Sequence, residues 1–206
     1  QEVMDLAPVA HLSAIKGRVP FINFFDGFRT SHEIQKVAIW DYKDLAEMVD
    51  MDAVEAFRKR ALNPERPTMR GSHENGDIFF QHREACNQYY DALPEVVEKY
   101  MGKINAKLGT NYQLFNYYGA PDADRVIIAM GSICDVAEEV IDYLNAHGEK
   151  VGMVKVHLYR PFRADKLLAA IPATCKALAV LDRTKEPGSA GEPLYKDVVT
   201  ALANAN

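Results

Sequence analysis

The second half of the chain alternates between two hydrophobic periods. Three apolar runs have the length of strands: 125–132 (RVIIAMGS), 151–162 (VGMVKVHLYRPF) and 176–182 (KALAVLD). After each run, apolar residues recur at helical spacing, which predicts helices at 133–148, 164–171 and 192–203. Strands and helices in alternation favour an α/β fold, with three α/β/α layers around a mainly parallel sheet.

The helix predicted over residues 133–148 carries an apolar stripe. Its members recur at i, i+3, i+4, i+7, i+8 and i+11, and they are Ile133, Val136, Ala137, Val140, Ile141 and Leu144. We expect this stripe to face the sheet. Ser132 has a side chain suited to capping the helix, and Gly148 can end it in a left-handed conformation.

The chain opens with a different pattern. Residues 1–18 are typical of a helix, and the aromatic run 19–28 (VPFINFFDGF), bounded by Pro20 and Gly27, predicts a buried strand. This helix–strand remnant lacks neighbours in the sequence, and the chain begins within a predicted element. We therefore expect a piece of a longer polypeptide, with a domain boundary near residues 34–42.

Between these regions the pattern is mainly helical. Residues 40–70 predict two short helices, the second capped by Asp50, and a polar connector follows at 65–77 with His73 exposed. A longer helix is predicted at 93–108, and the aromatic, period-2 run 112–119 predicts a further strand.

Composition narrows the class of protein. The 206 residues include 24 Lys and Arg against 29 Asp and Glu, a net charge of −5, so nothing points to nucleic acid or an anionic membrane. There is no apolar run of the roughly 18 residues that a membrane span requires. Cys86, Cys134 and Cys175 lie far apart without metal-ligand spacing, which indicates reduced cysteines in a cytoplasmic protein and no metal site.

The loops after the predicted strands should meet at the carboxyl edge of the sheet, where α/β proteins bind ligands. Gly131 and Ser132 place backbone N–H groups at a helix start, Arg160 suits a carboxylate or phosphate, and Gly188, Ser189 and Gly191 form a tight turn before a helix. An anionic ligand is one interpretation. A capped helix, a salt bridge to a neighbouring domain and an ordinary turn are the alternatives.

A second polar group follows the 19–28 run, comprising Arg29, Thr30, Ser31, His32 and Glu33. It is either a solvated turn or part of a site. Lys36 stands where a zinc-binding H-E-x-x-H motif needs its second histidine. The glycines at 188–191 fit neither G-x-G-x-x-G nor a P-loop, because Lys185 precedes them. No catalytic set stands out, so the residues alone indicate an α/β binding or assembly domain.

Longer strings carry a more specific signal. The most distinctive are VPFINFFDGFRTSHE (19–33), ALNPERPTMRG (61–71), VVEKYMGKIN (96–105), LFNYYGAPDADRVIIAMGS (114–132), VKVHLYRPF (154–162) and VLDRTKEPGSAGEPLY (180–195). In this order, and over nearly the whole chain, they resemble pyruvate:ferredoxin (flavodoxin) oxidoreductase.

The resemblance implies that residues 1–40 end a first domain that shares in binding thiamine diphosphate and pyruvate. Residues 41–206 would form a second domain similar to the C-terminal domain of transketolase, with 112–119 as its one antiparallel strand. The full-length family decarboxylates pyruvate with thiamine diphosphate, Mg, iron–sulfur clusters and coenzyme A. It forms a homodimer and passes electrons to ferredoxin or flavodoxin.

The parts of the family that hold these cofactors have no counterpart in this sequence. We therefore expect no catalytic or cofactor-binding residue here, and an inactive isolated chain that holds the remaining domains of the polypeptide. On this interpretation residues 29–33 form an active-site wall or an interdomain contact. Arg183, Lys185 and residues 188–191 form a docking edge for neighbouring domains.

Overall fold

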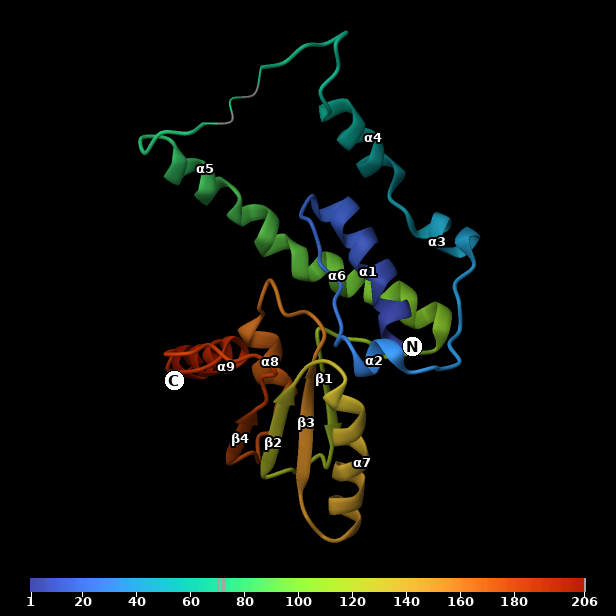
Figure 1. Ribbon diagram of the computed structural model, residues 1–206, viewed down its shortest axis with the longest axis vertical. Coiled ribbons are helices and arrows are strands. Elements are labelled where there is room, and N and C mark those ends of the chain that lie inside the picture. The colour runs from blue at the N-terminus through green and yellow to red at the C-terminus, as the bar shows by residue number, and fades with distance from the viewer. Residues whose placement is uncertain (70, 72, 206) are drawn as a thin grey trace. The chain divides into compact units, whose positions relative to one another are not determined.

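The computed structural model describes residues 1–69, 71 and 73–205, and it divides into two compact units. Unit 1 comprises Gln1–Asn23 and Lys36–Thr110, and unit 2 comprises Phe24–Gln35 and Asn111–Asn206. Figure 1 labels the elements of both. In the described ranges, no helix is long and apolar enough to cross a membrane.

Unit 1 is helical. Its helices are α1 (Glu2–Gly17), α3 (Tyr42–Met48), α4 (Met51–Arg60), α5 (Phe79–Ala85) and α6 (Asn87–Leu108). Its core lies where α1 packs on α6: Val9 and Leu12 on α1 are buried, as are Leu93, Val97 and Ile104 on α6. Burying these apolar faces against each other is what stabilises two otherwise solvent-exposed helices.

Most helix predictions in unit 1 are confirmed. Asp50 caps α4, because its carboxylate accepts a hydrogen bond from the Ala53 N–H at 2.9 Å. The helix predicted at 93–108 begins six residues earlier, at Asn87. The described residues of the 65–77 connector contain no helix or regular strand, and His73 is exposed; Arg70 and Ser72 lie outside the described residues.

The strand predicted at residues 19–28 is wrong. This segment forms no helix or strand and pairs with no strand in the described part of the chain. Its large side chains are open to solvent, with Ile22 85%, Phe24 62% and Phe28 80% exposed. A strand needs a neighbour to satisfy its backbone groups, and none is available here.

Unit 2 is the predicted α/β body. In chain order it contains α2 (Arg29–His32), β1 (Phe115–Gly119), β2 (Arg125–Ala129), α7 (Ile133–Ala146), β3 (Val151–Val156), α8 (Ala164–Ala170), β4 (Ala177–Val180) and α9 (Pro193–Ala205). The sheet order is β1-β3-β2-β4. β2 runs parallel to β3 and β4, whereas β1 is antiparallel to β3, as predicted.

The strand predicted at 151–162 ends early, at Val156. The next two N–H groups, of His157 and Leu158, both donate to the carbonyl of Leu114, and the chain then leaves the sheet. Phe162 folds back and its ring packs on Phe115 of β1 at 5.5 Å. The apolar run therefore continues as core beyond the strand, which is why the pattern alone overestimates the strand's length.

The two faces of the sheet are covered by different helices. Side chains alternate between faces along each strand, so Ile127 and Ala129 point to one face and Val126 and Ile128 to the other. α7 packs on β3 and β1 at the first face, where Ala129, Cys134, Ala137, Ile141 and Met153 form a buried cluster. α8 contacts β1, and α9 contacts β4 and α8.

The apolar stripe predicted for α7 is only partly correct. Ala137 and Ile141 face the sheet together with Cys134. Ile133, Val136 and Val140 do not: they are 36%, 60% and 49% exposed. A helical repeat tells which residues share a side of the helix, but the width of the surface beneath decides how many of them are covered.

Candidate functional site

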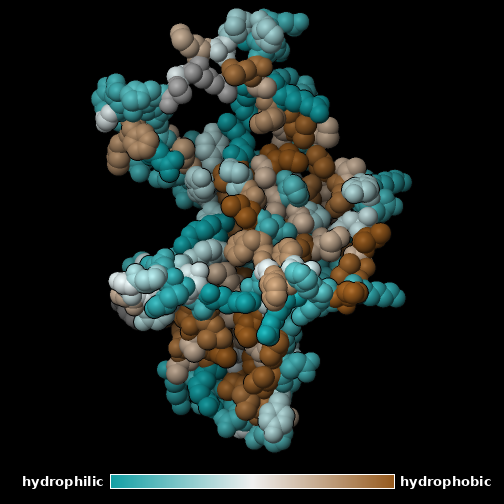
Figure 2. Space-filling view, in the orientation of Figure 1, coloured by the Kyte–Doolittle hydropathy of each residue, from teal (hydrophilic) through white to brown (hydrophobic). Residues whose placement is uncertain are grey.

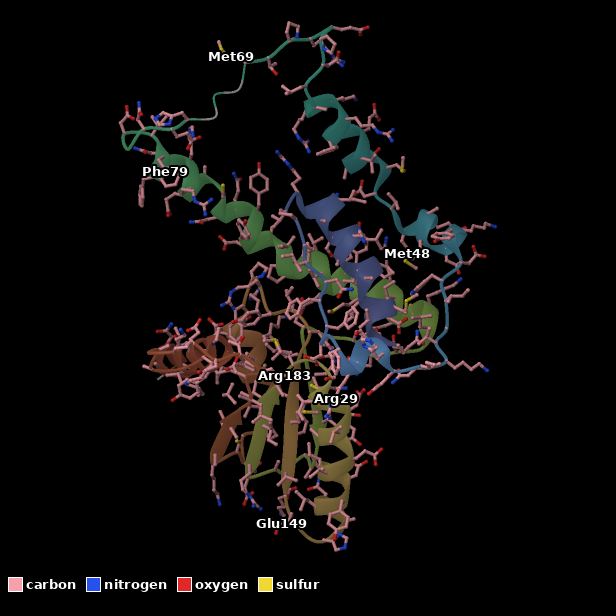
Figure 3. The ribbon with its side chains drawn as sticks, viewed as in Figure 1. Arg29, Met48, Met69, Phe79, Glu149 and Arg183 are labelled. Atoms are coloured by element: carbon pink, nitrogen blue, oxygen red, sulfur yellow. The ribbon has the colours of Figure 1, made fainter. Side chains whose placement is uncertain are left out.

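The carboxyl ends of β2, β3 and β4 lie at one edge of the sheet in unit 2. Figure 3 shows Arg183 and Arg29 at this end of the sheet and Glu149 at the opposite end. Most of the site residues predicted from the sequence lie in the loops at this edge. Their contacts show which of them act together.

The centre of the edge is Asp26, which the sequence did not single out. Its Oδ2 accepts a hydrogen bond from the Ser132 N–H at 2.8 Å and another from the Ser132 hydroxyl. Its Oδ1 lies 2.9 Å from Nη1 of Arg183. One carboxylate therefore joins three segments of unit 2: the 24–35 stretch, the start of α7 and the loop after β4.

The surroundings of Asp26 stabilise its charged form. The Ser132 hydroxyl is the main cause that lowers the pKa of this carboxyl, and the Ser132 N–H and Arg183 act in the same direction. Burial opposes them, since it disfavours the charge. Asp26 is thus an ionised anchor at neutral pH.

The start of α7 is occupied by this carboxylate. Ser132 is the N-cap residue, but its side chain makes no capping bond within the helix, contrary to the prediction. Asp26 supplies the acceptor in its place and puts a negative charge at the positive end of the helix dipole. Gly131 permits this approach, because it has φ +84° and a Cβ there would lie 3.1 Å from Asp26 Oδ2.

The start of α9 has an internal carboxylate of its own. Asp182, at the end of β4, accepts hydrogen bonds from the N–H groups of Leu194 at 3.2 Å and Tyr195 at 3.0 Å. The starts of α7 and α9, two of the three helices that follow the parallel strands, are therefore both bound by carboxylates of the chain itself.

The glycine turn at 188–191 is held by local contacts. Gly188 has φ +80°, and the Ser189 hydroxyl donates to the carbonyl of Gly191 at 2.8 Å. Lys185 pairs with Glu192 at 3.1 Å. Beside this turn is an open hollow of about 340 Å³, lined by Val180, Leu181, Asp182, Thr184, Lys185, Glu192 and Tyr195. Its charged groups are two carboxylates and one paired lysine, an arrangement that does not favour an anion.

Arg160 is separate from the Asp26 cluster. Its guanidinium lies 2.8 Å from Asp197 on α9 and stacks on the ring of Tyr159 at 4.0 Å. Burial raises the pKa of the Tyr159 hydroxyl, and the charge of Arg160 opposes that shift. Arg160 therefore ties the loop after β3 to α9.

The polar group at 29–33 forms the single turn α2. Ser31 donates from its hydroxyl to the Phe28 carbonyl at 3.1 Å, and Gln35 donates to Glu33 at 3.3 Å. Thr30 is half-buried, whereas Arg29, Ser31, His32 and Glu33 are exposed. The side-chain contacts of Asp26 go to Ser132 and Arg183 and not to this group.

The residues present do not fit a metal or an iron–sulfur cluster. Cys134 is buried on the inner side of α7, and Cys86 and Cys175 are free thiols elsewhere in the chain. In the part of the chain that the structure describes, no three His, Cys, Asp or Glu side chains gather as a ligand set. No catalytic step through a cofactor is assigned to these residues.

Comparisons with known proteins give the family. Residues 1–102 match the family model described as pyruvate flavodoxin/ferredoxin oxidoreductase, thiamine diphosphate-binding. Residues 123–206 match the model of pyruvate:ferredoxin oxidoreductase core domain II. Together these models cover most of the chain.

Relatives match along all or nearly all of the chain, as two of them show. A pyruvate-flavodoxin oxidoreductase of Enterobacter agglomerans is 63% identical over 206 residues, covering 100% of this chain and 18% of the relative. A pyruvate:ferredoxin oxidoreductase of Moorella thermoacetica is 60% identical over 203 residues, covering 98% of this chain and 17% of the relative. The chain thus spans less than a fifth of the length of these relatives.

One solved structure that aligns with this chain is 2-oxoglutarate:ferredoxin oxidoreductase from Magnetococcus marinus. The alignment covers 57% of this chain and 20% of that protein's chain, with 24% sequence identity and a TM-score of 0.36. That similarity is too low to support an argument. The two family models and the identities of 60% and 63% along the chain are decisive. The chain belongs to the pyruvate:ferredoxin (flavodoxin) oxidoreductase family.

Proposed function

We propose that the polypeptide containing this chain is a thiamine-dependent oxidoreductase that decarboxylates pyruvate and passes the acetyl group to coenzyme A. The observation that carries the proposal is the 63% identity, along the whole chain, to a pyruvate-flavodoxin oxidoreductase. Electrons would leave through iron–sulfur clusters to ferredoxin or flavodoxin. The full-length protein would be a cytoplasmic homodimer that holds thiamine diphosphate and Mg outside this chain.

Within that enzyme, this chain is a domain-docking region without the catalytic centre. Its carboxyl edge supports this role, because Asp26 and Asp182 occupy the two helix starts and Arg183 pairs with Asp26. Such an edge presents a fixed shape to a neighbour instead of an empty cradle for a ligand. Residues 29–33 are then a contact to another domain or to the wall of the active site.

The domain boundary near residues 34–42 stays a prediction, with residues 1–40 ending the first domain and 41–206 forming the second. The extents of the two family models favour another candidate, a junction between residues 102 and 123. Limited proteolysis of the full-length enzyme, with cleavage sites read by mass spectrometry, would distinguish the two.

The segment at 22–28 is the best-supported docking element. Its large apolar side chains, Ile22, Phe24, Phe25 and Phe28, are exposed, and it has no strand partner in the described ranges. We infer that it pairs with a strand of the polypeptide outside this chain. Burying these apolar side chains against a partner would gain about 25 cal/mol for each Å² of apolar surface removed from water.

The activity is tested with the full-length protein. Reduction of a viologen dye that depends on both pyruvate and coenzyme A is expected from the full-length enzyme, and none from the 206-residue chain alone. A full-length protein that reduces the dye only with another 2-oxoacid would refute pyruvate as its substrate. Turnover by the isolated chain would refute the docking role.

The docking role has its own test. Phe24→Asp should leave the isolated chain folded, because Phe24 is 62% exposed, but should impair assembly and activity of the full-length enzyme. Phe80→Asp is a matched control, since Phe80 is 68% exposed on α5. If both variants lost assembly and activity equally, or if neither variant lost them, the segment would not be a specific docking strand.

The alternative of a module that binds coenzyme A or phosphate at the sheet edge gains no support from these contacts. An anion there would have to displace Asp26 or Asp182 from a helix start. Titration calorimetry of the chain with coenzyme A and with inorganic phosphate decides between the binding module and the docking edge. Heat of binding at millimolar ligand would favour the binding module. No heat of binding would favour the docking edge.

A further inference from the structure

One face of the sheet in unit 2 is covered over only half its width. Ile127 on β2 lies beside Met153 on β3 and beside Ala179 on β4, so these three side chains form one row across the sheet. Met153 is completely buried beneath α7, Ile127 is half-buried and Ala179 is exposed. On this face, the burial of the side chains therefore decreases from β3 through β2 to the edge strand β4.

The opposite face is better covered. Val126 and Ile128 on β2 are 2% and 0% exposed, and their partners on β4, Leu178 and Val180, are half-buried. Two helices, α8 and α9, lie on that side. Strands are about 4.8 Å apart and a helix is about 10 Å wide, so a four-stranded sheet accommodates two helices on each face. On the face of α7 there is room for one more helix, over β2 and β4.

α7 presents an apolar side that borders this space. Ile133, Val136, Val140 and Tyr143 recur at i, i+3, i+7 and i+10, and they are 36%, 60%, 49% and 62% exposed. This is the a/d spacing by which one helix packs along another. Asp142 marks the other side of α7, because its carboxylate accepts from the Tyr118 hydroxyl of β1 at 2.8 Å. The apolar side is therefore turned away from β1, toward β2 and β4.

These residues form one surface, which we name the β2–β4 groove. Its wall is Ile133, Val136, Val140 and Tyr143 of α7, and its floor is Ile127, Ala177, Ala179 and Leu181. Leu181, just after β4, is 41% exposed. Figure 2 shows apolar surface gathered over the sheet of unit 2. The wall is helical and the floor is flat, a shape suited to an amphipathic helix.

Charge distinguishes the possible occupants. α7 carries four acidic residues (Asp135, Glu138, Glu139 and Asp142) and no Lys or Arg between residues 133 and 146. Glu138 is paired with Lys155 at 2.6 Å, whereas Glu139 is adjacent on the helix surface to Val136 and Tyr143. A second copy that packed its α7 here would bring like charges together. A helix with Lys or Arg along that edge would be attracted.

We propose that the β2–β4 groove binds an amphipathic helix whose apolar face packs on Val136, Val140 and Leu181 and whose basic edge meets Glu139. The inference rests on the proposed docking function, and the remaining polypeptide is the proposed source of the helix. More than four-fifths of the length of the relatives lies outside the matched stretch, which leaves ample chain to supply it.

Two synthetic helical peptides of about 21 residues test the chemistry. Both carry Leu at every a and d position; one has Lys at the flanking positions and the other has Glu there. Fluorescence anisotropy with the 206-residue chain should show that the Lys peptide binds at least about tenfold more tightly. Equal affinities, or no binding by either peptide, would overturn the proposal.

Variants place the binding on the groove. Val140→Glu should abolish binding of the Lys peptide, whereas the matched control Val199→Glu, at a 44% exposed valine on α9, should not. In the full-length enzyme, Val140→Glu should lower the Tm more than Val199→Glu does, while the two should be equal in the isolated chain. Sedimentation that shows a dimer of the chain lost with Val140→Glu would identify a second copy as occupant and refute the basic helix.

These outcomes are separate from the test of the proposed function. Viologen reduction by the full-length enzyme establishes the reaction whether or not the groove binds a helix. Peptide binding to the isolated chain, in turn, establishes the groove without any turnover.

Discussion

Removing the carboxylate of Asp26 should weaken the carboxyl edge of unit 2. Asp26→Ala removes the acceptor for two hydrogen bonds from Ser132 and the ion pair with Arg183. Loss of a helix-capping acceptor costs about 1 kcal/mol, with a range of about 0.5–2. Arg183 is 65% exposed, so the ion pair adds only about 0.5 kcal/mol. We expect the free energy of unfolding to fall by about 1.5 kcal/mol.

Urea unfolding of the chain measures this change, and hydrogen exchange locates it. The Ser132 N–H donates to Asp26, so its exchange should become about tenfold faster in Asp26→Ala. Asp26→Asn keeps an oxygen acceptor and should lose roughly half as much stability. Glu139→Gln, which removes one charge from an exposed position on α7, should change stability by less than about 0.5 kcal/mol.

The effect should also depend on pH. The pKa of Asp26 is lower in the folded state than in the unfolded chain, so its contribution is fully present above the unfolded value of about 3.9. It is lost as pH falls through the folded pKa, below that value. The difference in stability between the native chain and Asp26→Asn should therefore shrink between pH 6 and pH 3. An unchanged Ser132 exchange rate in Asp26→Ala would refute the anchor.

Three further changes have expected outcomes. Gly131→Ala should destabilise unit 2 by about 1–2 kcal/mol in urea unfolding, because φ at this residue is +84° and the new methyl group would approach Asp26. An unchanged stability would contradict the close approach of Asp26 to Gly131. Asp182→Ala should lower the free energy of unfolding by about 1 kcal/mol and speed hydrogen exchange of the Leu194 N–H. An equally stable variant with slow exchange would show that α9 does not need this cap. Ile128→Ala, at a completely buried position, should lower the free energy of unfolding by about 2–5 kcal/mol, whereas Ile133→Ala should lower it by less than about 1 kcal/mol. Equal losses of stability would place Ile133 in the core.

The body of unit 2 could be predicted because its signals are local. Each predicted strand and helix of this stretch shows its period within 7 to 16 residues, and the order of elements favours a mainly parallel sheet. The antiparallel role of 112–119 came from the family resemblance and was confirmed as β1. Boundaries were less exact, because apolar residues after Val156 continue the core without continuing the strand.

The failures have a common physical origin. The apolar run at 19–28 has the composition of a strand, but a strand forms only where another backbone pairs with it. Ile133 and Val140 have the spacing of a core stripe, but they remain 36% and 49% exposed. In both places the local pattern records apolar composition and spacing, which do not tell whether another element covers the residues.

The candidate site was missed for a different reason. Gly131, Ser132 and Arg183 were identified, yet Asp26, which joins them, lies 106 residues before Ser132. A pairing over such a distance leaves no period in the sequence. The available signal was modest: an acidic residue followed by glycine at the end of an aromatic run, next to residues 29–33 that had already been singled out.

The carboxylates at the helix starts decide what the sheet edge can do. A free helix start beside a strand end attracts anions, which is why this edge first suggests a ligand site. Here Asp26 satisfies the Ser132 N–H at the start of α7, and Asp182 satisfies two N–H groups at the start of α9. A ligand would gain only the difference between its own contacts and those that it displaces. The same bonds hold the loops after β2 and β4 in fixed positions, so a small anion would have to break them before it could bind at either helix start.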